Sequence, residues 1–127
     1  MEEDLITFET SKLAKELGFD EDAYHFYNEN GTFVTQMSEN INYYEKYKAV
    51  TQFLLQKWIR EKYNLAVWIP PLRVSTASES GFRYTWIITD VKIDEDWNDE
   101  TPLGFLTYEE ALEIGLQEAL QIIKKKK

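Results

Sequence analysis

The segment TYEEALEIGLQEALQII (107–123) constrains the fold more than any other part of the chain. Thr107 with Glu110 three residues later is a capping box, in which a hydroxyl and a carboxylate satisfy N–H groups of the first helical turn. Apolar residues then recur at helical spacing, which predicts a long amphipathic helix. Its apolar face carries a stripe of small residues, Ala111, Gly115 and Ala119. Such a stripe lets a helix backbone lie close against a sheet, so the rest of the chain is expected to supply one.

Two further helices are predicted upstream. The first begins after Thr7 as N-cap, carries Glu9 in its first turn, and ends before Gly18, a favourable residue just beyond a helix C-terminus. The second lies within residues 49–64, where the apolar face is wide enough to be buried on more than one side. Asn64 is placed to cap its end.

Strands are predicted in the remaining segments. Asn30-Gly31 favours a type I′ hairpin that pairs Tyr27 with Val34. The run 65–71 ends at a Pro-Pro pair, and 82–93 alternates as one strand with Phe82, Tyr84, Trp86 and Ile88 on one face. The sequence PLGF (102–105) is a candidate third strand of this sheet. Residues 38–50 give no clear pattern.

These elements predict an α+β fold in the order helix, hairpin, helix, two or three antiparallel strands, helix, with the helices packed on an antiparallel sheet. We expect residues 1–127 to form a single globular domain, with 1–4 and 124–127 frayed. Apolar residues make up 43% of the chain and aromatic residues 15%, as expected for a folded core.

Composition argues against several classes of function. The chain has no cysteine and one histidine, His25, so thiolate chemistry is excluded and a triad or a histidine-based metal site lacks its companions. Five scattered glycines form neither a P-loop nor a dinucleotide fingerprint. We therefore expect no enzyme, no cofactor and no metal. The acidic N-terminus lacks the features of a signal peptide and no apolar run approaches ~20 residues, which predicts a cytoplasmic, soluble protein with no membrane partner.

The run KIDEDWNDETPLGF (92–105) contains five acidic residues between Asp94 and Glu100. Asp94, Asp96 and Asn98 match the first ligands of an EF-hand loop, but Asp99 replaces its glycine and Phe105 its closing glutamate. A solvated hairpin loop is the better interpretation. Trp97 in its middle either folds back onto the core or is exposed for contact.

Net charge is −9, and without the tail Lys124–Lys127 the body has 10 basic against 23 acidic residues, or −13. Such a body repels nucleic acid and anionic lipid. Our leading hypothesis is a non-enzymatic intracellular accessory protein that binds another protein, or itself as a homodimer. Tyr and Trp are common interface anchors, so the candidate interface residues are Tyr43, Tyr44, Tyr47 and Trp97.

Three blocks of the sequence resemble a family of small proteins encoded by gut bacteria and their prophages. They are ITFETSKLAKELGFDE (6–21), TQFLLQKWIREKYNLAVWI (51–69) and TYEEALEIGLQEALQII (107–123). The molecular function of that family is not assigned, so the resemblance implies a phage or mobile-element setting without an activity.

A weaker similarity links LGFLTYEEALEIGLQEAL (103–120) to the strand-then-helix end of AP2 and integrase-arm DNA-binding domains. It implies an alternative in which a three-stranded sheet contacts nucleic acid through Arg73, Arg83 and Lys92. The neighbouring acidic run makes this partner unfavourable. A third alternative is an acidic DNA mimic that inhibits a host protein, for which the carboxylates must line one face.

Overall fold

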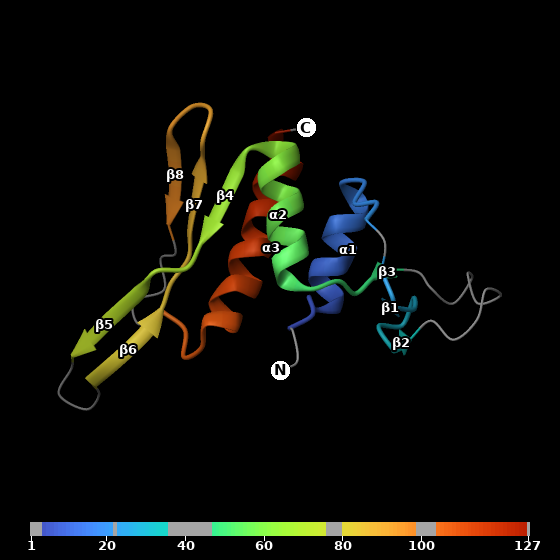
Figure 1. Cartoon of the computed structure of the whole chain (residues 1–127), viewed down its shortest axis with the longest axis horizontal. Coiled ribbons are helices and arrows are strands. Elements are labelled where there is room, and N and C mark those ends of the chain that lie inside the picture. The colour runs from blue at the N-terminus through green and yellow to red at the C-terminus, as the bar shows by residue number, and fades with distance from the viewer. Residues whose placement is uncertain (1–3, 22, 36–46, 76–79, 99–103, 127) are drawn as a thin grey trace.

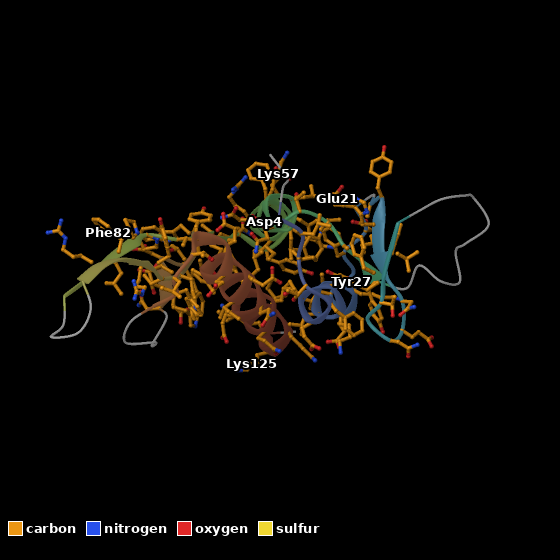
Figure 2. All side chains as sticks on the ribbon, turned by 90° about the horizontal axis from the view of Figure 1, so that it is seen from below. Asp4, Glu21, Tyr27, Lys57, Phe82 and Lys125 are labelled. Atoms are coloured by element: carbon orange, nitrogen blue, oxygen red, sulfur yellow. The ribbon has the colours of Figure 1, made fainter. Side chains whose placement is uncertain are left out.

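The α+β prediction is confirmed in a computed structural model of the chain, which describes residues 4–21, 23–35, 47–75, 80–98 and 104–126. Within these residues three helices combine with antiparallel strands in three small sheets (Figure 1). The molecule is elongated. Figure 2 places Phe82 towards one end and Tyr27 towards the other, with the helices between them.

Helix α3 (Tyr108–Lys126) lies at the centre of the fold. The sheet of β4 (Leu65–Trp68), β7 (Ile87–Asp90) and β8 (Glu95–Asn98) packs on one side of it. Helices α1 (Phe8–Glu16) and α2 (Gln52–Tyr63) pack on another side (Figure 1). Because α3 is covered from two directions, it buries Leu116 and Leu120 as well as the small-residue stripe. The core joins these layers in a single cluster of buried apolar side chains.

The predicted helix ends are confirmed. Thr7 is the N-cap of α1, its side chain accepts from the N–H of Thr10, and Gly18 follows the helix with a φ of 85°. Asn64 ends α2 in the left-handed conformation. At the start of α3, the N–H of Glu110 donates to Thr107 Oγ1 at 3.1 Å, as a capping box requires.

The small-residue stripe of α3 does bring the helix against the sheet. A Cβ atom built on Gly115 would stand 3.0 Å from Trp86 Cβ and 3.1 Å from Val67 Cγ1. At the other end α3 continues through Lys126, where the sequence suggested fraying from residue 124. Ion pairs join Lys124 to Glu16 at 2.8 Å and Lys126 to Asp90 at 3.7 Å in this last turn.

The first hairpin is present, but its predicted register is wrong by one residue. β1 (His25–Tyr27) pairs with β2 (Phe33–Thr35), so that Phe26 rather than Tyr27 lies opposite Val34. The reason is Asn28, whose side-chain oxygen accepts from the N–H groups of Asn30 and Thr32 and closes a longer loop than the expected two-residue turn. The short strand β3 (Tyr47–Lys48) pairs with the other edge of β1.

Residues 65–75 and 80–90 form the two arms of one long hairpin that bends in its middle. The arm predicted to end at the Pro-Pro pair splits into β4 (Leu65–Trp68) and β5 (Pro71–Ser75), which begins at the second proline. The returning arm, predicted as one strand, splits into β6 (Ser80–Tyr84) and β7 (Ile87–Asp90). β5 and β6 form a separate ribbon that extends beyond the helices (Figure 1). Phe82 is therefore 59% exposed, whereas Trp86 and Ile88 are buried as expected.

The third strand of the main sheet is the acidic run itself. β8 (Glu95–Asn98) pairs antiparallel with β7, which corrects the expectation of a loop there. Of the segment PLGF, residues 102 and 103 lie outside the described residues, and Phe105 forms an isolated bridge with Tyr84. The alternation of β8 explains its pairing, because Trp97 lies opposite the buried Ile88 and faces the helices, while Asp96 faces away.

A buried carboxylate joins the three helices. Glu113 of α3 is only 8% exposed. Its Oε2 accepts from the Thr7 N–H and Oγ1, both at 2.9 Å, and from the Thr10 hydroxyl. Its Oε1 accepts from Gln52 Nε2 at 2.9 Å. Glu113 thus reaches the N-cap N–H of α1 from another helix, as the glutamate of a capping box does within one helix.

Tyr27 lies close to this network, and its stability contribution depends on pH. Its hydroxyl donates to the Ile6 carbonyl at 2.8 Å. Burial, reinforced by the Glu113 carboxylate, raises the pKa of Tyr27 above its usual 10.0. Because the folded state holds this proton more tightly than the unfolded state, the contribution is complete below pH ~10 and is lost as the pH rises through the folded pKa.

We expect Tyr27→Phe to lower the free energy of unfolding by about 1 kcal/mol at neutral pH through loss of this hydrogen bond. The variant should also lose less stability than the wild type when the pH is raised to about 11. Urea unfolding at both pH values measures the two effects. Tyr24, which is 80% exposed, gives the matched control Tyr24→Phe. Equal alkaline losses in wild type and Tyr27→Phe would contradict the assignment.

Candidate functional site

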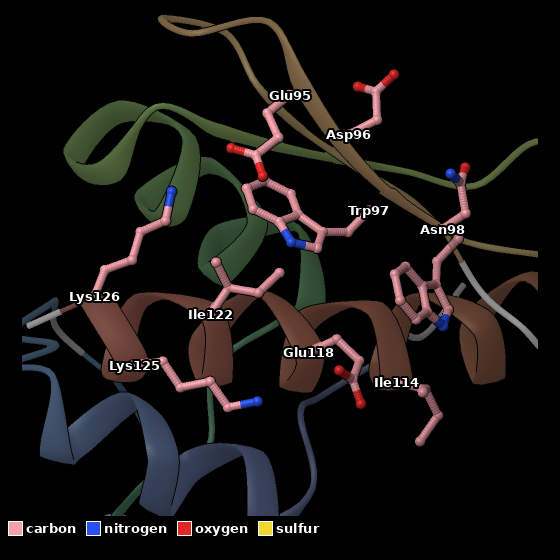
Figure 3. Close-up of a pocket in the computed structure, with 10 residues that line it drawn as sticks. Glu95, Asp96, Trp97, Asn98, Ile114, Glu118, Ile122, Lys125 and Lys126 are labelled. Atoms are coloured by element: carbon pink, nitrogen blue, oxygen red, sulfur yellow. The ribbon is translucent and has the colours of Figure 1, made fainter.

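An open cleft of about 1040 Å³ lies between helix α3 and strand β8, which we call the α3–β8 cleft. It is positioned by the sheet, because β8 lies beyond β7 at the side of the sheet away from β4. Figure 3 shows Trp97 reaching from β8 towards Ile122 on α3. The residues lining the cleft are Trp86, Glu95, Asp96, Trp97, Asn98, Ile114, Glu118, Ile122, Lys125 and Lys126.

The apolar part of the cleft comes from both walls. Trp97 is half-buried on the sheet side, and Ile114 and Ile122 are half-buried on α3. Trp86, which is 8% exposed, carries the only buried side-chain polar atom found without a hydrogen-bond partner in the described part of the chain, its Nε1–H. An unpaired buried donor of this kind costs about 1–3 kcal/mol. The cleft therefore combines two indole rings with a donor that is left unsatisfied in its wall.

Charged side chains surround this apolar surface. Glu95 and Glu118 carry exposed carboxylates on the rim, whereas Asp96 borders the cleft but directs its carboxylate to the outer face of the sheet. Lys126 lies over the Trp97 ring at 5.0 Å from its centroid and also pairs with Asp90, so its charge already has a partner inside the molecule. Lys125 also lines the cleft, so the rim carries both signs of charge, and the acidic excess of this region lies on the turn and outer face of β8, at Asp94 and Asp96.

The acidic residues of this region also shape the β7–β8 turn. The Asp90 side chain accepts from the N–H groups of Lys92 and Ile93, at 3.0 and 3.3 Å, and Asp94 has a φ of 55°. On the outer face of the sheet, Asp96 Oδ1 accepts from Thr89 Oγ1 at 2.7 Å. The Asp90 side chain therefore holds the tight turn, and Asp96, one of the residues that resembled calcium ligands, bonds to the neighbouring strand.

Of the predicted interface residues, the structure brings only Trp97 into this cleft. Tyr47 is on β3, where its ring contacts Phe8 at 5.4 Å and lies under Lys15 at 4.9 Å. Figure 1 places β3 and β8 on opposite sides of the helices. Tyr43 and Tyr44 fall outside the described residues.

The predicted nucleic-acid residues are not gathered on one surface. Arg73 lies opposite Phe82 in the β5–β6 ribbon, whereas Arg83 lies opposite Leu72, so the two arginines are on different faces of the ribbon. Lys92 is in the β7–β8 turn, at the far end of the bent hairpin (Figure 1). Exposed carboxylates are present on all three helices and on β8, and the DNA-mimic alternative, which requires them to line one face, stays a prediction.

Sequence reasoning missed the helical wall of the cleft. Ile114, Glu118 and Ile122 are spaced by four residues and lie on one side of α3, next to the stripe that contacts the sheet. The signal was present, because α3 is apolar over more of its circumference than contact with a single sheet requires. What the pattern lacked was the position of β8, which decides which flank of the helix stays open.

His25 has a structural environment, with its ring stacked on Phe33 at 5.2 Å. Across residues 4–21, 23–35, 47–75, 80–98 and 104–126, no three His, Cys, Asp or Glu residues are grouped so that they could hold a metal ion. None of the helices in these ranges has the length and apolar character needed to cross a membrane. Comparisons with protein-family models, curated proteins and solved structures found no match.

Proposed function

We propose that the chain is a non-enzymatic binding protein that contacts another protein through the α3–β8 cleft. The observation that carries this proposal is the position of Trp97, a large ring held half-buried on an edge strand and facing an open cleft with apolar walls. Tryptophan is among the residues most enriched at the energetic centres of interfaces, where a ring fills a pocket and neighbouring contacts exclude water.

The pairing of Lys126 with the Trp97 ring supports the proposal. It holds the indole in place over the end of α3 before any partner arrives. Less side-chain entropy is then lost on binding than for a freely rotating ring, and preorganisation of this kind favours affinity. The surrounding carboxylates of Glu95 and Glu118 form the polar rim that such a contact usually has.

We expect Trp97→Ala to reduce capture of protein partners at least tenfold when tagged protein is mixed with nuclease-treated host lysate and read by quantitative mass spectrometry. The matched control is Trp68→Ala. Trp68 is on the same sheet and 48% exposed, but its side chain is on the opposite face, where its Nε1 donates to Thr89 Oγ1 at 3.3 Å. Both variants should keep the wild-type circular dichroism spectrum.

Three results would count against the proposal. Equal capture by wild type and Trp97→Ala would place the contact elsewhere. Capture that disappears with nuclease treatment would favour nucleic acid as the ligand, and the test would move to Arg73, Arg83 and Lys92. A Trp97-dependent dimer in analytical ultracentrifugation, with no other protein captured, would identify the partner as a second copy of the chain.

A further inference from the structure

We propose that the α3–β8 cleft receives an extended basic segment of the partner protein, which adds to the sheet as a fourth strand beside β8. The inference rests on the proposed function and specifies the chemistry of the partner. Three features of the site support it: a free strand edge, the charge along that edge and the apolar wall behind it.

The first feature is the edge. Among the strands that the structure describes, β8 pairs with β7 alone, and Figure 1 shows it as the outermost strand of its sheet. Alternate peptide groups of Glu95–Asn98 therefore point away from the sheet with their N–H and C=O groups available. An edge of this kind is a template for another extended chain, and main-chain hydrogen bonds supply much of the affinity in such complexes.

The second feature is charge. Glu95 and Asp96 are exposed on β8, and Asp94 precedes them in the turn. Two copies of β8 placed edge to edge would bring these carboxylates together, and like charges across neighbouring strands are destabilising. A strand that carries lysine or arginine would instead form opposite-charge pairs. The edge thus disfavours a second copy of the chain and favours a basic segment.

The third feature is the wall that the segment would face. Side chains of an added strand alternate between the two faces of the sheet. Those on the helix side would meet Trp97, Ile114 and Ile122, which suit apolar residues, with Glu118 between the two isoleucines. A segment that alternates apolar and basic residues matches this surface.

The test uses the full chain labelled with ¹⁵N and a capped peptide of alternating lysine and valine, nine residues long. We expect saturable shifts of the backbone amides of Glu95–Asn98, and affinity that falls as salt is raised. Two kinds of control peptide separate the contribution of charge from that of main-chain hydrogen bonds. One has glutamate in place of lysine. The other is N-methylated at every second residue, and it is made in two versions so that the methyl groups face β8 in one and point away in the other. The glutamate peptide, and the N-methylated version whose methyl groups face β8, should each bind at least tenfold more weakly.

Charge reversal provides the matched protein control. The double variant Glu95→Lys with Asp96→Lys should bind the lysine peptide at least tenfold more weakly than the wild type. The double variant Asp20→Lys with Glu21→Lys makes the same change in net charge near the end of α1, and its affinity for the peptide should stay within about twofold of the wild type. Equal weakening by both pairs, or full binding of both N-methylated peptides, would overturn the inference. So would a lysate partner that depends on Trp97 but is not displaced by the lysine peptide, and in that case the proposed function would stand.

Discussion

Glu113→Ala is expected to lower the free energy of unfolding by about 3–4 kcal/mol, because Glu113 is the centre of a buried hydrogen-bond network. The substitution removes the acceptor of four donors, namely the Thr7 N–H, the Thr7 and Thr10 hydroxyls, and Gln52 Nε2. Three of these donors come from the N-cap and first turn of α1 and one from the first turn of α2. Loss of the carboxylate leaves the N-terminal ends of two helices without their shared partner.

Chemical unfolding monitored by circular dichroism measures this effect, and two variants calibrate it. Glu118→Ala removes an exposed carboxylate from the same helix and should change stability by less than about 0.5 kcal/mol. Glu113→Gln keeps one acceptor oxygen but turns an NH₂ group towards the remaining donors, so we expect an intermediate loss of about 1–2 kcal/mol. If Glu113→Ala and Glu118→Ala were equally stable, the buried network would make no net contribution to folding.

The helix ends were predictable from the sequence because their signals are local. Thr7, Asn64 and Thr107 each act on N–H or C=O groups within one helical turn, so the residue type and its spacing are sufficient. The register of the first hairpin was wrong for a related reason. Asn28 and the Asn30-Gly31 pair compete for the same short loop, and the hydrogen bonds of Asn28 prevail.

Features that depend on distant partners could not be derived. Glu113 looks like a surface residue in the helical pattern, and its burial follows from donors on α1 more than 100 positions away. The acidic run has poor strand propensity, yet Glu95–Asn98 becomes a strand because β7 offers a pairing edge and Trp97 gains contact with α3. The cleft follows from this pairing, so Trp97 was predicted by its residue type while the helical wall was not.

Gly115→Leu is expected to lower the free energy of unfolding by about 3 kcal/mol through overpacking between α3 and the sheet. At this position even a Cβ atom would stand 3.0 Å from Trp86 Cβ and 3.1 Å from Val67 Cγ1, closer than ordinary contact. A leucine adds three more carbons in the same gap, and its better helix propensity, worth about 1 kcal/mol, offsets only part of the strain.

The matched control is Gln121→Leu, which places the same side chain at a half-buried position of the same helix and should be nearly neutral. In thermal unfolding, a difference of about 3 kcal/mol corresponds to a melting temperature about 10 °C lower for a chain of this size. Because Trp86 contacts Gly115 and also lines the α3–β8 cleft, any folded Gly115→Leu protein should show altered tryptophan fluorescence and weaker binding of the lysine peptide. Equal melting temperatures for the two leucine variants would mean that α3 does not need glycine to approach the sheet, and the link between this contact and the shape of the cleft would be lost.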